Sequence, residues 1–185
     1  VKPEHVVKEL KAIDFVLEAE ASTFRLNGLS FDILHFPLLV SGERSIMFEL
    51  EGFKAISSGL REKFGSAGEF LLYEMGKRCG ERDVLYFTKK YGLRGFDAAR
   101  AILAETVGRG WCYPEIVEFD DKRLEGVVAA RELFECIPYS SSQNPTCHFF
   151  RGYLTGIFSQ LFDRDFIVRE RECVSKGDRK CVFTV

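Results

Sequence analysis

The amino-acid sequence predicts an α+β fold, in which helices pack over an antiparallel sheet. Helical and strand patterns occur in separate runs, and the C-terminal third contains adjacent strand pairs joined by short polar turns. The 185 residues suit one domain of ordinary size, and 46% of them are hydrophobic, which is enough for a sizeable core. Because long alternation of strand and helix is absent from this pattern, a Rossmann-type fold is not expected.

Apolar residues at helical spacing predict an amphipathic helix over residues 4–20. Its stripe consists of Val6, Val7, Leu10, Ile13 and Leu17. We assign residues 1–22 to this helix, as a linker or dimerisation element, and residues 23–185 to the main domain. Because the stripe needs an apolar partner, we expect a homodimer.

The pattern then changes from short strands to helices. Residues 23–50 read as short strands, because the turn dipeptides Asn27-Gly28 and Ser41-Gly42 interrupt them. The helical patterns that follow cover residues 51–64, 66–91 and 96–107. Ser66 and Glu69 have the spacing of a capping box at the start of the longest helix, and Gly92 is typical of its end.

The C-terminal third predicts a strand pair, a helix and a final hairpin. The two strands cover residues 111–119 and 124–134, and polar residues join them. Asn144 and Pro145 are typical of the N-cap and first position of a helix, which we expect to run to about residue 162. Residues 165–174 and 180–185 then form a hairpin around Gly177-Asp178.

Composition and motifs exclude several classes of protein. The net charge is −2 and charges of both signs are interspersed, so we expect no nucleic-acid contact by this domain. No apolar run approaches the roughly 18–20 residues of a membrane span, and no signal peptide is recognisable, so we expect a cytoplasmic protein without membrane contact. The motifs G-x-G-x-x-G, P-loop and H-E-x-x-H are absent, which favours a binding domain over an enzyme. Since the sequence begins at Val1 rather than Met, we expect it to be part of a longer chain.

Three of the six cysteines form a candidate zinc cluster. If Gly177 is the centre of the hairpin loop, Cys173 lies directly opposite Cys181, with Cβ atoms about 4.5–5.5 Å apart. Cys147 lies in the first turn of the preceding helix, where the helix dipole lowers the pKa of a thiol and favours the thiolate that binds zinc. Three thiolates and one further ligand would complete a tetrahedral structural site. The alternative interpretation is that these cysteines are small hydrophobic residues of the core.

The candidates for the fourth zinc ligand are Glu170, Glu172 and His148. Strict strand alternation places Glu170 on the face opposite Cys173, so Glu170 reaches the site only if a β-bulge interrupts the strand. The alternation is indeed broken in this segment, because apolar and charged residues share one face. The residues alone leave the choice open.

The helix after Pro145 has a broad apolar face. Core packing explains most of that face, but part of it is a candidate pocket wall beside the metal: Phe150, Tyr153, Leu154 and Phe158. Trp111 is either a further wall of that pocket or an ordinary strand aromatic. Gly152 and Gly156 lie one helical turn apart, as do Gly76 and Gly80; this spacing lets two helices approach closely or removes volume from a cavity floor.

The end of the chain carries a more specific motif. Gly152-Tyr153 is followed by Glu170 to Phe183, which fits the pattern E-x-x-C-x-x-x-G-[DH]-x-x-C and then an apolar strand. This motif resembles the vinyl-4-reductase domain family. The resemblance implies the α+β architecture that TRAPP transport-particle subunits and the sensory domains of phenol-responsive activators share. Those sensors bind zinc through three cysteines and one glutamate, which implies the ligands Cys147, Glu170, Cys173 and Cys181.

We therefore expect a small-molecule sensor or binding domain for a hydrophobic, including aromatic, ligand, with a structural zinc site. A ligand-free interaction scaffold is one alternative, which a TRAPP-like fold permits. A reductase or accessory protein of tetrapyrrole metabolism is another, which the family name implies. A pocket of several hundred Å³ near Cys147 would separate the sensor from the scaffold. A tightly bound redox cofactor would support the reductase.

Overall fold

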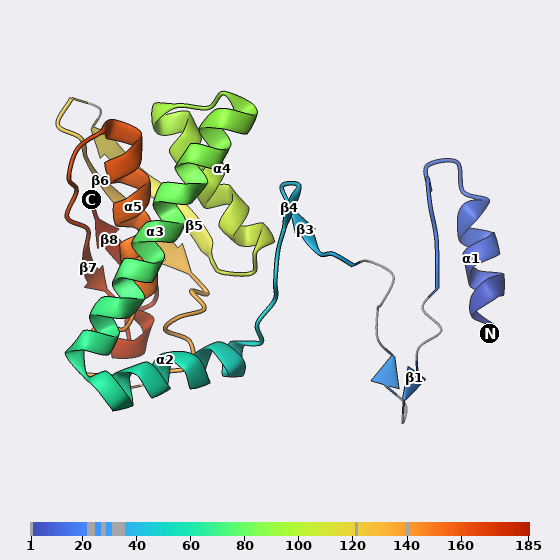
Figure 1. The fold of residues 1–185 in the computed structure, drawn as a ribbon, viewed down its shortest axis with the longest axis horizontal. Helices are drawn as coiled ribbons and strands as arrows, with labels where there is room; N and C mark the ends of the chain where they lie inside the picture. The colour runs from blue at the N-terminus through green and yellow to red at the C-terminus, as the bar shows by residue number, and fades with distance from the viewer. Residues whose placement is uncertain (1, 22–24, 27–28, 31–35, 121, 140) are drawn as a thin grey trace. The chain divides into compact units, whose positions relative to one another are not determined.

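The computed structural model describes residues 2–21, 25–26, 29–30, 36–120, 122–139 and 141–185. The chain divides into two compact units, Val1–Ile46 and Met47–Val185. Figure 1 traces both along the chain. The predicted boundary after residue 22 stays a prediction.

The first unit consists of short elements. Helix α1 covers Pro3–Lys11, so the predicted helix over residues 4–20 is too long. None of the residues of α1 is buried, and a short helix without a packed face gains too little to extend further. The predicted short strands occur as two antiparallel pairs, β1 (Arg25–Leu26) with β2 (Leu29–Ser30) and β3 (Leu39–Val40) with β4 (Glu43–Arg44). The predicted turn at Asn27-Gly28 lies outside the described residues.

Four helices of the second unit follow the sequence prediction closely: α2 (Leu50–Phe64), α3 (Ser66–Tyr91), α4 (Gly95–Gly108) and α5 (His148–Phe162). The predicted capping box is wrong, because Ser66 is already inside α3 and makes no capping hydrogen bond. Gly65 precedes the helix instead, with a φ of 57° that favours glycine. Gly92 ends α3 in the left-handed conformation, as predicted. Among the described helices, none combines the length and the apolar character that a membrane crossing requires.

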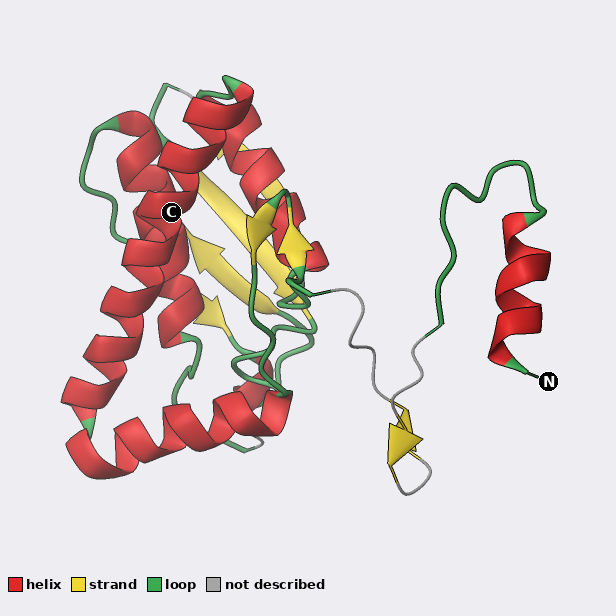
Figure 2. Ribbon diagram, turned by 45° about the vertical axis from the view of Figure 1, so that its right-hand side comes forward, coloured by secondary structure: helices red, strands yellow, loops and turns green. Residues whose placement is uncertain are grey.

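A four-stranded antiparallel sheet completes the second unit. Its strands are β5 (Tyr113–Asp120), β6 (Glu125–Arg131), β7 (Arg169–Glu172) and β8 (Cys181–Thr184), in the order β5-β6-β8-β7. Figure 2 shows helices covering one face of this sheet. The predicted α+β class is confirmed.

Helices α3 and α5 lie side by side and touch at the backbone (Figure 1). The contact is lined by four glycines: Gly76, Gly80, Gly152 and Gly156. A Cβ atom at Gly76 would lie 1.9 Å from the carbonyl oxygen of Phe149, and one at Gly152 would lie 1.9 Å from that of Tyr73. Gly152 and Gly156 therefore face α3, and the alternative that they form a cavity floor over the sheet is wrong.

Candidate metal centre

The C-terminal hairpin adopts the predicted register. Glu172 pairs with Val182, which is the register that places Cys173 opposite Cys181. A short 3₁₀ turn, η1 (Val174–Lys176), and Gly177 with a φ of 98° close the loop. Both thiols are fully buried, since neither side chain has accessible surface. The hairpin thus presents two sulfur atoms to the interior of the second unit.

The third predicted thiol comes from the start of α5. Cys147 precedes the first helical residue, His148, so α5 begins three residues later than the predicted start at Pro145. The Sγ atom of Cys147 lies 3.7 Å from the Sγ atoms of both Cys173 and Cys181. The structure therefore brings the three predicted cysteines into contact.

A fourth thiol, which the sequence interpretation missed, joins this group. Cys136 lies in the segment after β6, and its Sγ atom is 3.4 Å from that of Cys181. The sulfur atoms of Cys136, Cys147, Cys173 and Cys181 all lie within 4.8 Å of one another, and all four residues are buried. Pairing of β6 with β8, which places Ala130 opposite Cys181, leads the chain after β6 to this point.

Glu170 also reaches the edge of the thiol cluster. A bulge in β7 lies between Glu170 and Glu172, as the broken alternation predicts, and it shifts the face on which Glu170 lies. Oε2 of Glu170 accepts a hydrogen bond from the backbone N–H of Cys147 at 3.2 Å. Oε1 is buried and has no hydrogen-bond partner among the described residues.

The other two candidates for the fourth position lie elsewhere. Nε2 of His148 faces Oε1 of Glu69 at 3.5 Å. Glu172 is exposed. Of the three predicted alternatives, Glu170 is thus the one that contacts a cysteine of the cluster.

Burial dominates the electrostatics of the thiol cluster. It raises the pKa of Cys147 well above its usual value, so the predicted lowering by the helix dipole is wrong for the metal-free thiol. Hydrogen bonds from the other thiols, Cys136 first, lower the pKa of Cys173. Burial, followed by the neighbouring Cys173, raises the pKa of Glu170 to about 9. Because several acids in a dry site disfavour one another's ionisation, this cluster has the character of a site completed by a cation.

A second buried carboxylate, Glu135, holds the first turn of α5 beside the cluster. It accepts hydrogen bonds from the backbone N–H groups of Phe149 at 2.8 Å and of Phe150 at 2.9 Å. Burial raises the pKa of Glu135 to about 7, although these two donors and Arg61 oppose the shift. Sequence interpretation missed this cap, because no local pattern connects residue 135 with residue 149.

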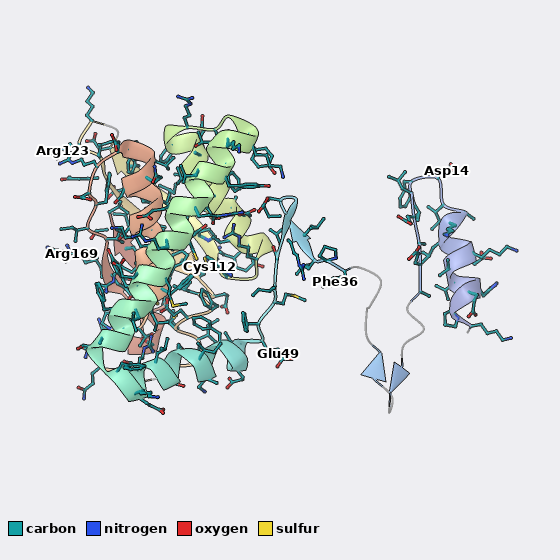
Figure 3. The ribbon with its side chains drawn as sticks, viewed as in Figure 1. Asp14, Phe36, Glu49, Cys112, Arg123 and Arg169 are labelled. Carbon is teal, nitrogen blue, oxygen red and sulfur yellow. The ribbon has the colours of Figure 1, made fainter. Side chains whose placement is uncertain are left out.

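The donor set fits zinc. Thiolates are soft ligands that zinc prefers, and four of them, or three with a carboxylate, fill a tetrahedral coordination sphere. Such a closed set leaves no position for substrate and is typical of structural sites. Two cysteines lie outside the cluster: Cys79 is exposed, and Cys112 is buried beside Thr106 (Figure 3).

The five residues predicted to line a ligand pocket lie in the aromatic core. Phe150, Tyr153, Leu154 and Phe158 have no accessible surface, and Trp111 is partly buried. The ring centroids of Trp111 and Tyr153 are 5.1 Å apart, and those of Phe150 and Phe183 are 5.4 Å apart. In this structure the rings contact one another between α5 and the sheet, and their role in ligand binding stays a prediction.

A buried ion pair lies next to these rings. Asp83 of α3 accepts hydrogen bonds from the Tyr153 hydroxyl at 2.8 Å and from Arg109 at 2.6 Å. Arg109 also pairs with Glu105 and stacks over the Trp111 ring, 5.1 Å from its centroid. The network joins α3, α4 and α5 behind the aromatic core.

The solvent-accessible clefts that we find in the described residues have other linings. One of about 420 Å³ lies beside the thiol cluster and is bordered by His148, Arg151 and Glu170. Another, of about 710 Å³, is bordered by Arg123 and Arg169, which Figure 3 labels. The five predicted pocket residues line neither of these two clefts.

Comparison with known proteins places the C-terminal part of this structure in a family. Residues 127–185 match the family model of the vinyl-4-reductase domain, which confirms the predicted resemblance. A curated relative, an uncharacterized protein of Methanocaldococcus jannaschii, is 44% identical over 45 residues. This match spans 24% of the chain and 28% of the length of that relative.

Solved structures share the fold at low sequence identity. The phenol-responsive sensory domain of the transcription activator PoxR, solved with phenol, has a TM-score of 0.68 at 21% identity and covers 77% of this chain and 76% of its own. A vinyl-4-reductase family protein of M. jannaschii scores 0.53 at 23% identity and covers 76% and 82%. A trafficking protein particle complex subunit 3 of Naegleria fowleri, covalently bound to palmitic acid, scores 0.54 at 14% identity and covers 73% and 90%. The predicted TRAPP-like architecture is confirmed.

Proposed function

We propose that the second unit is a zinc-stabilised small-molecule-binding domain of the vinyl-4-reductase type. The observation that carries the proposal is the buried contact of Cys147, Cys173 and Cys181, which come from α5 and from both sides of the final hairpin. Zinc bound there would fasten the hairpin to α5. Six free cysteines are consistent with a reducing compartment, and we propose the cytoplasm as the location.

Elemental analysis of the full chain, purified without chelator, tests the zinc site. We expect one zinc per chain. Cys181→Ala should abolish binding, whereas Cys79→Ala, at an exposed thiol outside the cluster, should retain it. Absence of stoichiometric metal, or a disulfide between Cys173 and Cys181, would contradict the proposal.

We propose that the ligand is a small hydrophobic molecule with an aromatic ring, bound among the rings between α5 and the sheet. Two findings support this: the fold is shared with a sensory domain solved with phenol, and aromatic and aliphatic side chains already gather there. An aromatic guest would make the same edge and stacking contacts that these rings make with one another. Because the rings are closely packed, binding requires side chains to move apart.

Phenol is the probe for this ligand site. Trp111 is the single tryptophan, and its ring contacts Tyr153, so we expect a saturable change in its fluorescence as phenol is added. Leu154→Phe adds volume in the buried core and should weaken the response. Leu71→Phe, at a partly exposed position of α3, is the matched control. Lack of saturation up to millimolar phenol, or equal weakening by both variants, would contradict the ligand proposal and leave the zinc proposal standing.

An interaction scaffold is the second candidate function, because an apolar strip on α3 is exposed. This α3 apolar strip consists of Phe70, Leu71 and Met75, with 60%, 44% and 52% of their surface exposed. We propose that it packs against a second copy of the chain, since an exposed apolar surface on a helix is stabilised by burial. Light scattering should give twice the 21.1 kDa of one chain. Leu71→Glu should restore the monomer, and Val117→Glu, at an exposed site on β5, should not.

A further inference from the structure

We infer that Cys136 supplies the fourth thiolate of the metal site and that Glu170 lies outside the coordination sphere as a reserve ligand. The inference rests on the proposed zinc site and specifies its ligands. It assigns separate tasks to two side chains that compete for one position, since zinc takes four ligands and five donors converge here.

The spacing of the sulfur atoms carries the assignment. A zinc–sulfur bond of about 2.3 Å in a tetrahedron places neighbouring sulfurs about 3.8 Å apart. The Sγ atoms of Cys147 and Cys173, and of Cys147 and Cys181, are 3.7 Å apart. That of Cys136 is 3.4 Å from Cys181, and none of the four exceeds 4.8 Å from another. Cys136 is therefore already at tetrahedral spacing before any metal arrives.

The backbone fixes Cys136 in this place. Its N–H donates to the carbonyl oxygen of Leu133 at 3.2 Å, and the N–H of Ile137 donates to the same oxygen at 3.3 Å. Leu133 is fully buried, and the adjoining Glu135 is bound to the first turn of α5. Because both neighbours are anchored, little conformational entropy is lost when the Cys136 thiolate binds a metal.

Polar hydrogens around the cluster point at sulfur, as thiolate coordination requires. The backbone N–H of Val174 donates to Sγ of Cys181 at 3.5 Å. The Ser175 hydroxyl lies 3.0 Å from Sγ of Cys173 and is fully buried. Such donors stabilise negative charge on metal-bound sulfur. They suit a site rich in thiolates.

Glu170 is already engaged by the helix. Its Oε2 satisfies the N–H of Cys147 at the start of α5, where a carboxylate is favourable. Its Oε1 is buried beside the cluster, without a partner in the part of the chain that the structure describes. When a thiolate is removed, this oxygen can take the open coordination position with little movement of the chain. This is why we describe Glu170 as a reserve ligand.

Zinc K-edge X-ray absorption on the full chain tests the assignment directly. We expect four sulfur ligands at about 2.3 Å in the wild type and in Glu170→Gln. Cys136→Ala should give three sulfurs and one oxygen at about 2.0–2.2 Å. The double variant should bind zinc at least about 10-fold more weakly than either single variant in competition with a chromophoric chelator. Cys79→Ala is the matched control for thiol removal.

Three sulfurs and one oxygen in the wild type would overturn the inference and leave the zinc site intact. Unchanged sulfur coordination in Cys136→Ala would overturn it as well. If Cys136→Ala fails to fold, the wild-type spectrum alone decides between the two ligand sets. A wild-type chain without zinc would overturn this inference and the proposed function together, so the two failures are distinguishable.

Discussion

The two halves of α5 are held in different ways. Its start lies among ionisable side chains from distant segments, with Glu135 and Glu170 accepting backbone N–H groups and the thiol of Cys147 in the cluster. Its middle packs against α3 through glycines, backbone on backbone. The second contact is complete with the atoms of the chain, whereas the first groups several buried acids that a cation would stabilise. The difference teaches that one helix can depend on two independent sources of stability.

Removal of zinc should have the largest effect and should act on the start of α5. We expect a chelator to reduce the free energy of unfolding by several kcal/mol, less than the roughly 10–16 kcal/mol of zinc-finger peptides, because the α3–α5 contact remains. Differential scanning calorimetry with and without chelator measures the change, and added zinc should reverse it. An unchanged melting temperature after proven metal removal would show that the thiol cluster is an ordinary core.

Gly152→Ala should break the other half of the comparison. The new Cβ would lie 1.9 Å from the Tyr73 carbonyl oxygen, so α3 and α5 must separate. We expect a loss of about 3 kcal/mol in urea unfolding, at the upper end of the usual cost of overpacking. Zinc content should stay at one per chain in the folded fraction. A loss below about 1 kcal/mol would mean that the helices can shift at little cost.

Tyr153→Phe tests whether the network behind the rings shares in fixing α5. The hydroxyl of Tyr153 donates to the buried Asp83 at 2.8 Å, and its removal leaves the carboxylate with fewer donors. We expect a loss of about 1–3 kcal/mol, smaller than for Gly152→Ala because Arg109 still pairs with Asp83. Urea denaturation measures it. Equal stability of variant and wild type would limit the role of this hydroxyl to binding.

Gly59→Ala should give the smallest change, with the opposite sign. No atom of the described residues lies within 4 Å of a Cβ built at Gly59 of α2, so only helix propensity acts. We expect a gain of about 0.5–1 kcal/mol. The variant is also the control for Gly152→Ala, since both introduce one methyl group into a helix. Destabilisation at Gly59 would reveal a contact on α2 in solution.

Those parts of the site that depend on local pattern could be predicted from the sequence. The centre of the hairpin loop at Gly177 set the register of Cys173 and Cys181, and the broken alternation indicated the bulge at Glu170. Cys136 escaped because its proximity to Cys181 depends on β8 lying next to β6, and strand order has no local signal. The start of α5 was misplaced for a similar reason. Distant carboxylates cap it, so the local preference of Asn144 and Pro145 does not decide where it begins.

The glycines show the same limit within helices. Their spacing predicts either a close helix contact or a cavity floor, and the choice depends on which neighbour the glycine face meets. In the structure that neighbour is the backbone of α3. The aromatic face of α5 is similarly ambiguous, because phenylalanines that fill a core and those that line a pocket have the same periodicity.

The strand order β5-β6-β8-β7 has a consequence for how the chain folds. Strand β8 follows β7 in the sequence yet separates it from β6, so β7 has no ladder to join until residues 181–184 are in place. The β5–β6 hairpin can form locally and early, whereas the pairing of β6 with β8 closes a loop of about fifty residues, which is slow. Until that closure, Cys136 and Cys147 lack Cys181. The assembly of the thiol cluster and the completion of the sheet are therefore a single late event in folding.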